Sequence, residues 1–272
     1  MFTIKLDLPS GKTVRIEELN NRNYLTIIKF CQNGDHEGLN NFFNDIYFNS
    51  DLNIFDRFYI LLCVRSMFID KVISYSGKGD AEIKYSISDI TSKLVDNYKE
   101  VEKVLEYKDF KIKVNIPTEL YFENIDDLYR STIVYVQYKE KKVYFSELTD
   151  DERNFILDKL PTQVFLLLQD YMNYLSDTLF DLTLIEENKD FEISEVKVNI
   201  LGNGVLFFLA SIFNFDLFSF FETYYYYTHF VSKGASDFYD MSFNEVRVLL
   251  NIHAERIEKE NREIKKQERL LT

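Results

Sequence analysis

Residues 54–69 are apolar on nearly every side, and this segment constrains the fold of the chain more than any other. A helix of this kind has to be covered all round, so we expect it at the centre of a core. A chain of 272 residues can bury roughly 70–75% of its unfolded surface, which allows such a core. The length suits one large domain or two small ones.

The segments before it have clear periodicities. Residues 3–8 and 13–16 alternate between apolar and polar around a Pro-Ser-Gly-Lys turn, which predicts a hairpin. Apolar residues at helical spacing predict helices over 19–31 and 37–47, and the Asn-Gly-Asp sequence at 33–35 is expected to end the first.

The middle of the chain is rich in short alternating segments. We expect a short helix over 90–98, which continues in one interpretation as far as Leu105. Expected strands lie over 81–87, 110–116, 132–138 and 142–145, with a short helix or turn at 125–129 between the second and the third.

From Thr149 onward the patterns are mainly helical. Thr149 with Glu152 and Ser242 with Glu245 fit capping boxes that open two helices. A long apolar helix is expected over 164–184, a strand over 191–200, and a helical segment from 205 to about 232. The last helix is mostly charged beyond Ile257, so we expect it to project into solvent or to lie on a partner.

These elements predict a helix-dominant α+β protein with an N-terminal hairpin and helices, a small β-rich middle and a helical C-terminal half. The expected parts are 1–75, 76–147 and 148–272, packed together. Residues 205–221 form the most apolar run of the chain. The run is slightly shorter than a membrane-spanning helix, and it contains Asp216, whose charge is costly inside a membrane. We therefore expect it to be a buried helix, with the choice between core and interface left open.

Charge narrows the classes of partner. The chain has 45 acidic residues against 32 Lys and Arg, a net charge of −13, which disfavours nucleic acid and anionic membranes and favours protein partners. The two cysteines, Cys31 and Cys63, lie in apolar helical context and are expected as buried thiols of a reducing cytoplasm.

No catalytic, cofactor or metal motif stands out. The three histidines are scattered, and the two Gly-x-Gly turns lack the spacing of a phosphate-binding loop. Asp56 and Arg65 are the notable charges of the apolar segment 54–69. We expect Asp56 to favour the start of that helix and Arg65 to be a buried, paired arginine that fixes neighbouring elements.

Aromatic side chains are the remaining signal. There are 25 Phe and 19 Tyr, and the densest block lies in the C-terminal half beside the charged tail. Tyrosine suits interfaces because it is apolar with a polar tip. An aromatic-rich codon bias is an alternative source of the excess. The expected protein-binding residues are Tyr224, Tyr225, Tyr226, Tyr227 and Phe230.

The segment LNIFDRFYILLCVRSMFIDKVI at 52–73 resembles a helix of the baseplate hub subunits and hub-assembly proteins of contractile-tailed, T-even-type phages. The turn at 8–12, the Ile116-Pro117 strand end and the helix start at 148–153 are similar too. So is the sequence Met241-Ser242-Phe243-Asn244-Glu245, although Asn244 replaces a proline that is usual in the family.

This resemblance implies a non-enzymatic protein without cofactors that binds other tail or baseplate proteins. It places the chain in the host cytoplasm during assembly, or in the virion tail baseplate, and leaves a homo-oligomer open. One alternative is an assembly chaperone absent from the mature virion. Another is an acidic hydrolase with paired carboxylates, and a third is a membrane-associated protein that uses residues 205–221.

Overall fold

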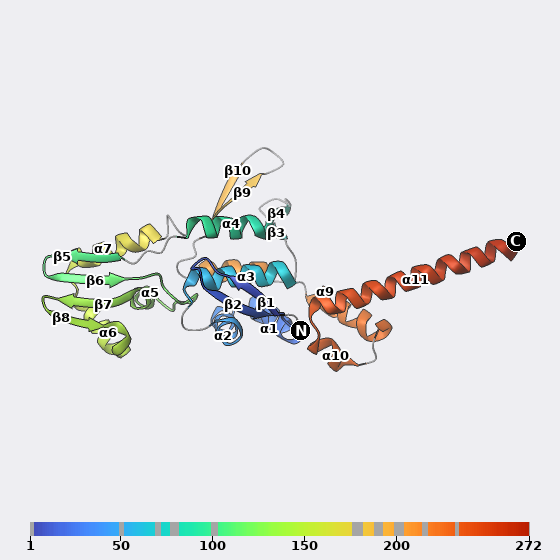
Figure 1. Cartoon of the computed structure of the whole chain (residues 1–272), viewed down its shortest axis with the longest axis horizontal. Helices are drawn as coiled ribbons and strands as arrows, with labels where there is room; N and C mark the ends of the chain where they lie inside the picture. Colours follow the sequence, from blue (N-terminus) through green and yellow to red (C-terminus); the bar gives the residue numbers. More distant parts are fainter. Residues whose placement is uncertain are drawn as a thin grey trace.

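The computed structural model describes residues 3–48, 52–68, 72–76, 82–98, 103–175, 182–187, 193–198, 204–213, 217–231 and 234–271. They form an elongated molecule with a four-stranded sheet at one end and a long C-terminal helix at the other (Figure 1). The N-terminal hairpin and helices lie between them. The predicted class, a helix-dominant α+β fold, is confirmed.

The central part is built as the periodicity predicts. Gly34 ends the first helix in the left-handed conformation, with φ 65°, and Asp35 begins the second by accepting a hydrogen bond from the Gly38 amide. The chain therefore turns within two residues. The elements of this part are β1 (Thr3–Asp7), β2 (Thr13–Glu17), α1 (Asn21–Asn33), α2 (His36–Tyr47) and α3 (Ile54–Phe68).

Helix α3 lies at the centre of the core, as its sequence predicts. Its fully buried apolar side chains are distributed around the helix axis; they are Ile54, Phe55, Phe58, Ile60, Leu61, Leu62 and Val64. Burial of each large apolar side chain stabilises the fold by about 1.5–3 kcal/mol, so this helix contributes a large share of the core.

The apolar run at 205–221 divides into two helices, α8 (Gly204–Phe213) and α9 (Leu217–Tyr226). Helix α8 packs on α1, α2 and α3, and its Phe213 ring lies 5.5 Å from the ring of Phe43. The first half of the run is thus core, while Asp216 falls outside the described residues. Within the described residues, no helix is long and apolar enough to cross a membrane.

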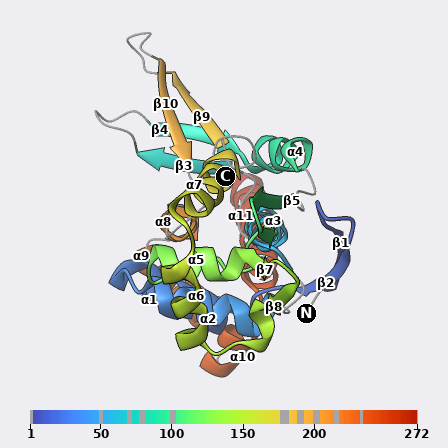
Figure 2. The same ribbon diagram turned by 90° about the vertical axis from the view of Figure 1, so that its left-hand side faces the viewer.

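The sheet has the order β5-β6-β7-β8 and is antiparallel throughout. Helix α6 lies on one face of it, where Phe155 and Ile156 line a shallow pocket together with Val136 and Val143 of the sheet. Two smaller hairpins project together from one side of the molecule near α4 (Figures 1 and 2). The bounds are β3 (Val72–Ser76), β4 (Glu82–Ser86), α4 (Ile87–Asn97), β5 (Lys103–Tyr107), β6 (Phe110–Val114), α5 (Ile125–Thr132), β7 (Ile133–Tyr138), β8 (Lys141–Tyr144), η1 (Phe145–Glu147), α6 (Asp150–Lys159), α7 (Thr162–Tyr174), β9 (Leu182–Glu187) and β10 (Ile193–Val198).

Two helical predictions extend too far. Residues 103–105 belong to strand β5 and do not continue α4, because Leu105 pairs with Ile112 and turns into the sheet core. Likewise, Leu182 and Leu184 lie in strand β9, paired with β10, and not in the long helix expected over 164–184. Strand β3 was not predicted, since its sequence continues the apolar pattern of α3. In each case backbone pairing with the next strand of a hairpin overrides the helical pattern.

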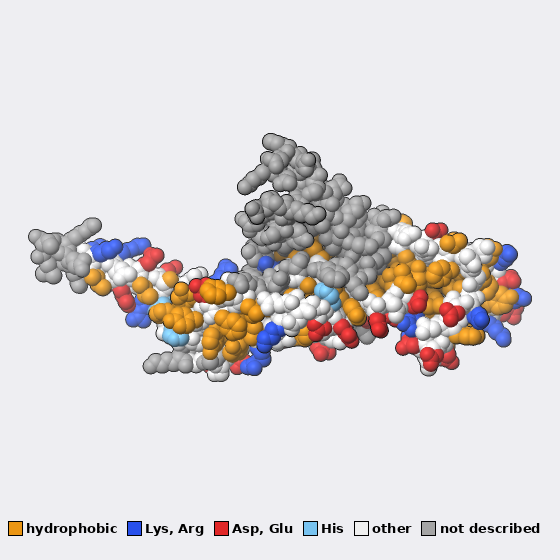
Figure 3. Space-filling view, turned by 180° about the vertical axis from the view of Figure 1, so that it is seen from behind, with side chains coloured by type: hydrophobic (Ala, Val, Ile, Leu, Met, Phe, Trp, Pro, Cys, Tyr) orange, Lys and Arg blue, Asp and Glu red, His pale blue; other side chains and the backbone are white. Residues whose placement is uncertain are grey.

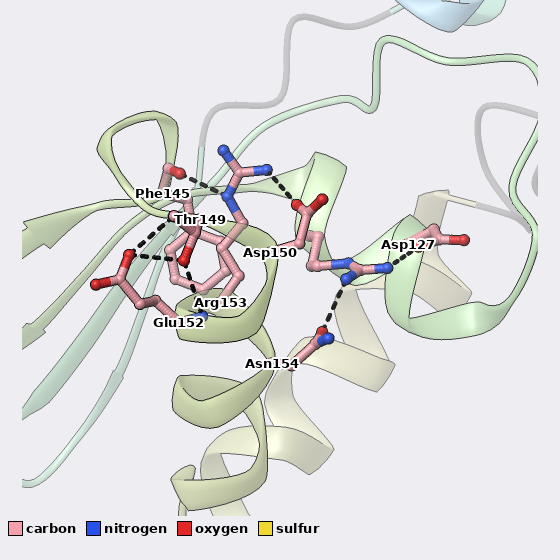
Figure 4. A network of polar contacts seen from close by, with 8 residues as sticks. Asp127, Phe145, Thr149, Asp150, Glu152, Arg153 and Asn154 are labelled. Carbon is pink, nitrogen blue, oxygen red and sulfur yellow. Dashed lines mark hydrogen bonds and ion pairs between the residues drawn. The ribbon is translucent and has the colours of Figure 1, made fainter.

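A polar network fixes the junction between the sheet and its covering helices (Figure 4). Thr149 and Glu152 form the predicted capping box at the start of α6. Arg153 donates from Nε to the Phe145 carbonyl over 2.7 Å. Arg130 on α5 pairs with Asp127 and donates to Asn154 on α6, so the two helices are held together on the same side of the sheet.

The C-terminal part comprises α9, the π-helical turn η3 (Tyr227–Val231), α10 (Ala235–Asp240) and α11 (Phe243–Leu271). It is attached to the start of α1. The backbone N–H of Asn21 donates to the Met241 carbonyl, and the side-chain Nδ2 of Asn21 donates to the Phe238 carbonyl, each over 2.8 Å. Glu18 accepts from Asn244 over 3.1 Å. These contacts orient α11 relative to the core.

Candidate protein-binding surface

Some aromatic side chains of α9 and η3 lie in the interior, and others lie on the surface. Phe220 and Tyr227 point inward and are almost fully buried. Both pack on Phe238 of α10, at ring-centroid distances of 5.5 and 5.7 Å. Tyr224 joins the same cluster at 5.1 Å from Phe238, edge to face. Such pairs contribute about 0.5–1.5 kcal/mol each beyond their burial, so Phe238 anchors this part of the molecule.

The opposite side of the same helix is exposed. Tyr225 and Tyr226 are 51% and 45% exposed, and Phe230 is 51% exposed. Tyr226 stacks on Phe230, and Tyr225 stacks on His229 at 3.9 Å. Together with Phe218 and Phe221, these three form what we call the C-terminal aromatic surface. Hydrophobic side chains gather over this region, at the base of α11, in Figure 3.

A groove separates this surface from α11. Its volume is about 430 Å³, and its walls come from Tyr226 and Phe230 on one side and from Leu250, His253 and Ile257 on the other. Nε2 of His253 is buried without a hydrogen-bond partner in the described residues. The groove is mainly apolar.

Helix α11 continues beyond the groove into solvent (Figure 1). Its 29 residues span roughly 44 Å at 1.5 Å per residue. Pairs Arg256–Glu260 and Glu258–Arg262 support the exposed part, but such pairs contribute only about 0.3–0.5 kcal/mol. Ile257 and Ile264 are exposed seven residues apart, so both lie on one face of the helix.

The structure separates the residues that the sequence grouped together. Tyr225, Tyr226 and Phe230 lie on the surface, whereas Tyr227 is in the core and donates from its hydroxyl to the sulfur of Met241 over 3.2 Å. Tyr224 is half-buried. A surface role for Phe218 and Phe221 was missed. The spacing 218, 221, 225 places all three on one helical face, and that signal was present in the sequence.

The two charged residues noted in α3 are both buried. Asp56 Oδ1 accepts a hydrogen bond from the Ser10 amide over 3.1 Å, which attaches the β1–β2 turn to α3. Burial raises the pKa of Asp56. Arg65 donates from Nε to the Ile212 carbonyl over 2.7 Å and thereby joins the ends of α3 and α8.

Other candidate chemistry is limited. Both cysteines are free, Cys63 is buried, and burial raises the pKa of the Cys31 thiol to about 12 and that of Cys63 to about 11. These thiols are therefore protonated at neutral pH and poorly nucleophilic. Across the described parts of the chain, no three His, Cys, Asp or Glu side chains gather as a metal site.

Comparison with known proteins identifies the family. Neither the curated proteins nor the solved structures give a match. The family model described as T4 bacteriophage base plate protein matches residues 1–199. This range includes α1 to α3, the sheet and its helices, whereas core helix α8, the C-terminal aromatic surface and α11 lie beyond it. Because the match extends over most of the chain, the protein belongs to the T4 bacteriophage base plate protein family.

Proposed function

We propose that this baseplate protein is a hub component or a hub-assembly protein, and that it acts by binding another tail or baseplate protein rather than by catalysis. The observation that carries the proposal is the C-terminal aromatic surface, where exposed rings border an apolar groove. Exposed aromatic clusters of this kind are typical cores of protein interfaces.

The packing beneath this surface supports the proposal. The rings that face outward sit on a helix whose inner face is fixed by Phe220, Tyr227 and Phe238. A rigid surface loses little conformational entropy when a partner binds, so more of the contact energy remains as affinity.

Helix α11 supplies a second contact. Its exposed part is near the length at which an isolated helix is marginal in water, so burial of Ile257 and Ile264 by a partner helix would stabilise it. We propose that the partner lies in the groove and along this face of α11, where it covers both isoleucines.

The test is a co-expression pull-down of the tagged chain with the tail and baseplate proteins of the same phage. The double variant Tyr226→Ser/Phe230→Ser should lose the baseplate partner that the unaltered chain retains. The matched control is Phe155→Ser, which removes an aromatic ring that is 63% exposed on the sheet end of the molecule. Retention of the partner by the double variant, or equal loss in the control, contradicts the assignment of this surface.

Mass spectrometry of purified virions then distinguishes a structural component from an assembly chaperone. A hub component is present in the mature particle in a fixed ratio to other baseplate proteins. A chaperone is present in assembling extracts of the host cytoplasm and absent from the virion.

A further inference from the structure

A shallow pocket lies between the sheet and α6, at the end of the molecule opposite α11 (Figure 1). Its volume is about 270 Å³. Pockets for small-molecule ligands have volumes of roughly 300–1,000 Å³, so this one suits a single large side chain better than a whole cofactor. We call it the sheet-end pocket, and the lining residues that determine its chemistry are Tyr138, Lys141, Val143, Phe155, Ile156 and Lys159.

Strand pairing and helix spacing bring these residues together. Tyr138 of β7 pairs directly with Lys141 of β8, and Val143 lies two residues further along β8, so all three belong to the same face of the sheet. On α6, Phe155 and Lys159 are four residues apart and therefore lie on one side of the helix. The pocket is thus built on regular elements, which fix the positions of its side chains before a partner arrives.

The apolar part of the pocket is open to solvent. Phe155 is 63% exposed and Tyr138 is 46% exposed, while Val143 and Ile156 are half-buried. Exposed apolar surface that is bordered by polar residues is typical of interaction sites. A large apolar side chain of a partner would cover these groups and would itself be removed from water, which favours binding.

The charged border of the pocket is positive. Among the described residues that line it, the charged ones are Lys141 and Lys159, and neither forms an ion pair with another described residue. The Lys159 ammonium lies 5.7 Å from the centre of the Phe155 ring. Glu140 and Asp158 precede the two lysines in the sequence, but neither lines the pocket. A carboxylate beside a bound apolar side chain therefore meets positive charge that these contacts leave uncompensated.

We propose that the sheet-end pocket docks a short segment of a second tail or baseplate protein, in which one large apolar side chain lies between acidic residues. The apolar side chain fills the pocket between Val143 and Phe155, and the carboxylates pair with Lys141 and Lys159. The net charge of −13 does not prevent this, because charges further away than about 8–10 Å are screened at physiological salt. With the C-terminal aromatic surface at the other end, the chain then joins two partners.

Nucleic acid fits the same pocket less well. It would also offer aromatic bases and negative phosphates, but its affinity depends on many clustered Lys and Arg side chains, and this pocket supplies two lysines. Members of a baseplate family have other baseplate proteins as neighbours. A protein segment is therefore the favoured occupant.

Fluorescence anisotropy with the full chain tests this inference. The probe is a fluorescein-labelled peptide that carries one phenylalanine with two aspartates on each side. We expect saturable binding that weakens as salt is raised. The same peptide with alanine in place of phenylalanine should bind at least about ten-fold more weakly, a change of about 1.4 kcal/mol. The variant Lys141→Gln/Lys159→Gln should lose at least as much affinity for the original peptide.

The matched control is Lys259→Gln/Lys266→Gln, which changes the net charge equally on the exposed part of α11 and should bind like the unaltered chain. Circular dichroism and urea unfolding check that both variants are folded. The inference is overturned if the peptide does not bind, if the alanine peptide binds as tightly, or if both variants lose binding equally. Tighter binding of labelled oligothymidylate overturns it too, as does self-association of the chain that Lys141→Gln/Lys159→Gln abolishes, since the occupant is then a second copy.

The variant Phe155→Ser separates this inference from the proposed function. It removes one wall of the sheet-end pocket, so it should bind the acidic peptide more weakly and still retain the partner of the C-terminal aromatic surface. Tyr226→Ser/Phe230→Ser should show the reverse, because those rings lie at the other end of the molecule. The two assignments can therefore fail separately.

Discussion

Arg57 offers the sharpest test of the energetics of this fold. Its guanidinium lies in the interior, where Nε donates to the Leu52 carbonyl and Nη1 donates to Asn44 Oδ1 over 2.9 Å and to Glu119 Oε2 over 3.0 Å. Burial lowers the pKa of Arg57, and the charge of Glu119 opposes this effect. The pair connects α3 with the chain that leaves the sheet after β6.

The perturbation is Glu119→Gln, which keeps an oxygen acceptor for Arg57 and removes the negative charge. Loss of one partner from a fully buried pair costs about 3–5 kcal/mol, whereas an exposed pair contributes about 0–1 kcal/mol. The side chain of Arg57 is 4% exposed and that of Glu119 is 42% exposed, so solvent screens one end only. We expect an intermediate loss of about 1–2 kcal/mol in the free energy of unfolding.

Urea unfolding followed by circular dichroism measures this loss. Arg57→Met and the double variant complete a cycle, whose coupling energy should be at least about 1 kcal/mol. The control is Glu106→Gln, which breaks a pair of similar length on the surface and should cost less than about 0.5 kcal/mol. Equal effects of the two glutamate substitutions, or zero coupling, would refute the reasoning that burial determines the strength of the pair.

Three further predictions concern substitutions of single residues. Phe238→Ala should lower the free energy of unfolding by about 3–5 kcal/mol, while Phe230→Ala should change it by less than about 1 kcal/mol. The reason is that only Phe238 is buried among other rings. Thermal denaturation of both variants checks this difference. Gly34→Ala should cost about 1–2 kcal/mol in urea unfolding, since the residue needs a positive φ of 65° and the space around it is open; no loss would show that the α1 end relaxes. The raised pKa of Asp56 means that its carboxyl stabilises the fold most below about pH 3.9 and that this contribution is lost as pH rises through the folded pKa. The free energy of unfolding of Asp56→Asn, relative to that of the unaltered chain, should therefore rise from low to neutral pH. A fall in this relative free energy over the same pH range contradicts the prediction.

Local patterns were enough to predict much of the fold. The hairpin at the start, the helices α1 to α3 and the capping box of Thr149 and Glu152 each depend on neighbouring residues, so the sequence contains their signals directly. The central position of α3 was also predictable, because a helix that is apolar all round has no face suited to water.

Elements that depend on strand pairing were not predictable in the same way. Residues 103–107 and 182–187 have patterns that a helix also satisfies, and only their pairing with β6 and β10 makes them strands. The candidate surface shows the same limit. Composition indicates that the tyrosines are candidate interface residues. Which of them are buried depends on α10, because Tyr227 packs on Phe238 of that helix whereas Tyr225 stays exposed.

By itself, then, the sequence determined the periodicities, the helix starts marked by capping residues, the excess of aromatic residues and the acidic net charge, since these need no knowledge of neighbours in space. Tertiary structure alone decided that Asn21 and Glu18 hold the start of α11, and that Lys111, Lys113 and Lys142 lie on one face of the sheet. The physical reason is that these contacts join residues far apart in the chain, some by more than two hundred positions, and no local preference encodes which of them meet.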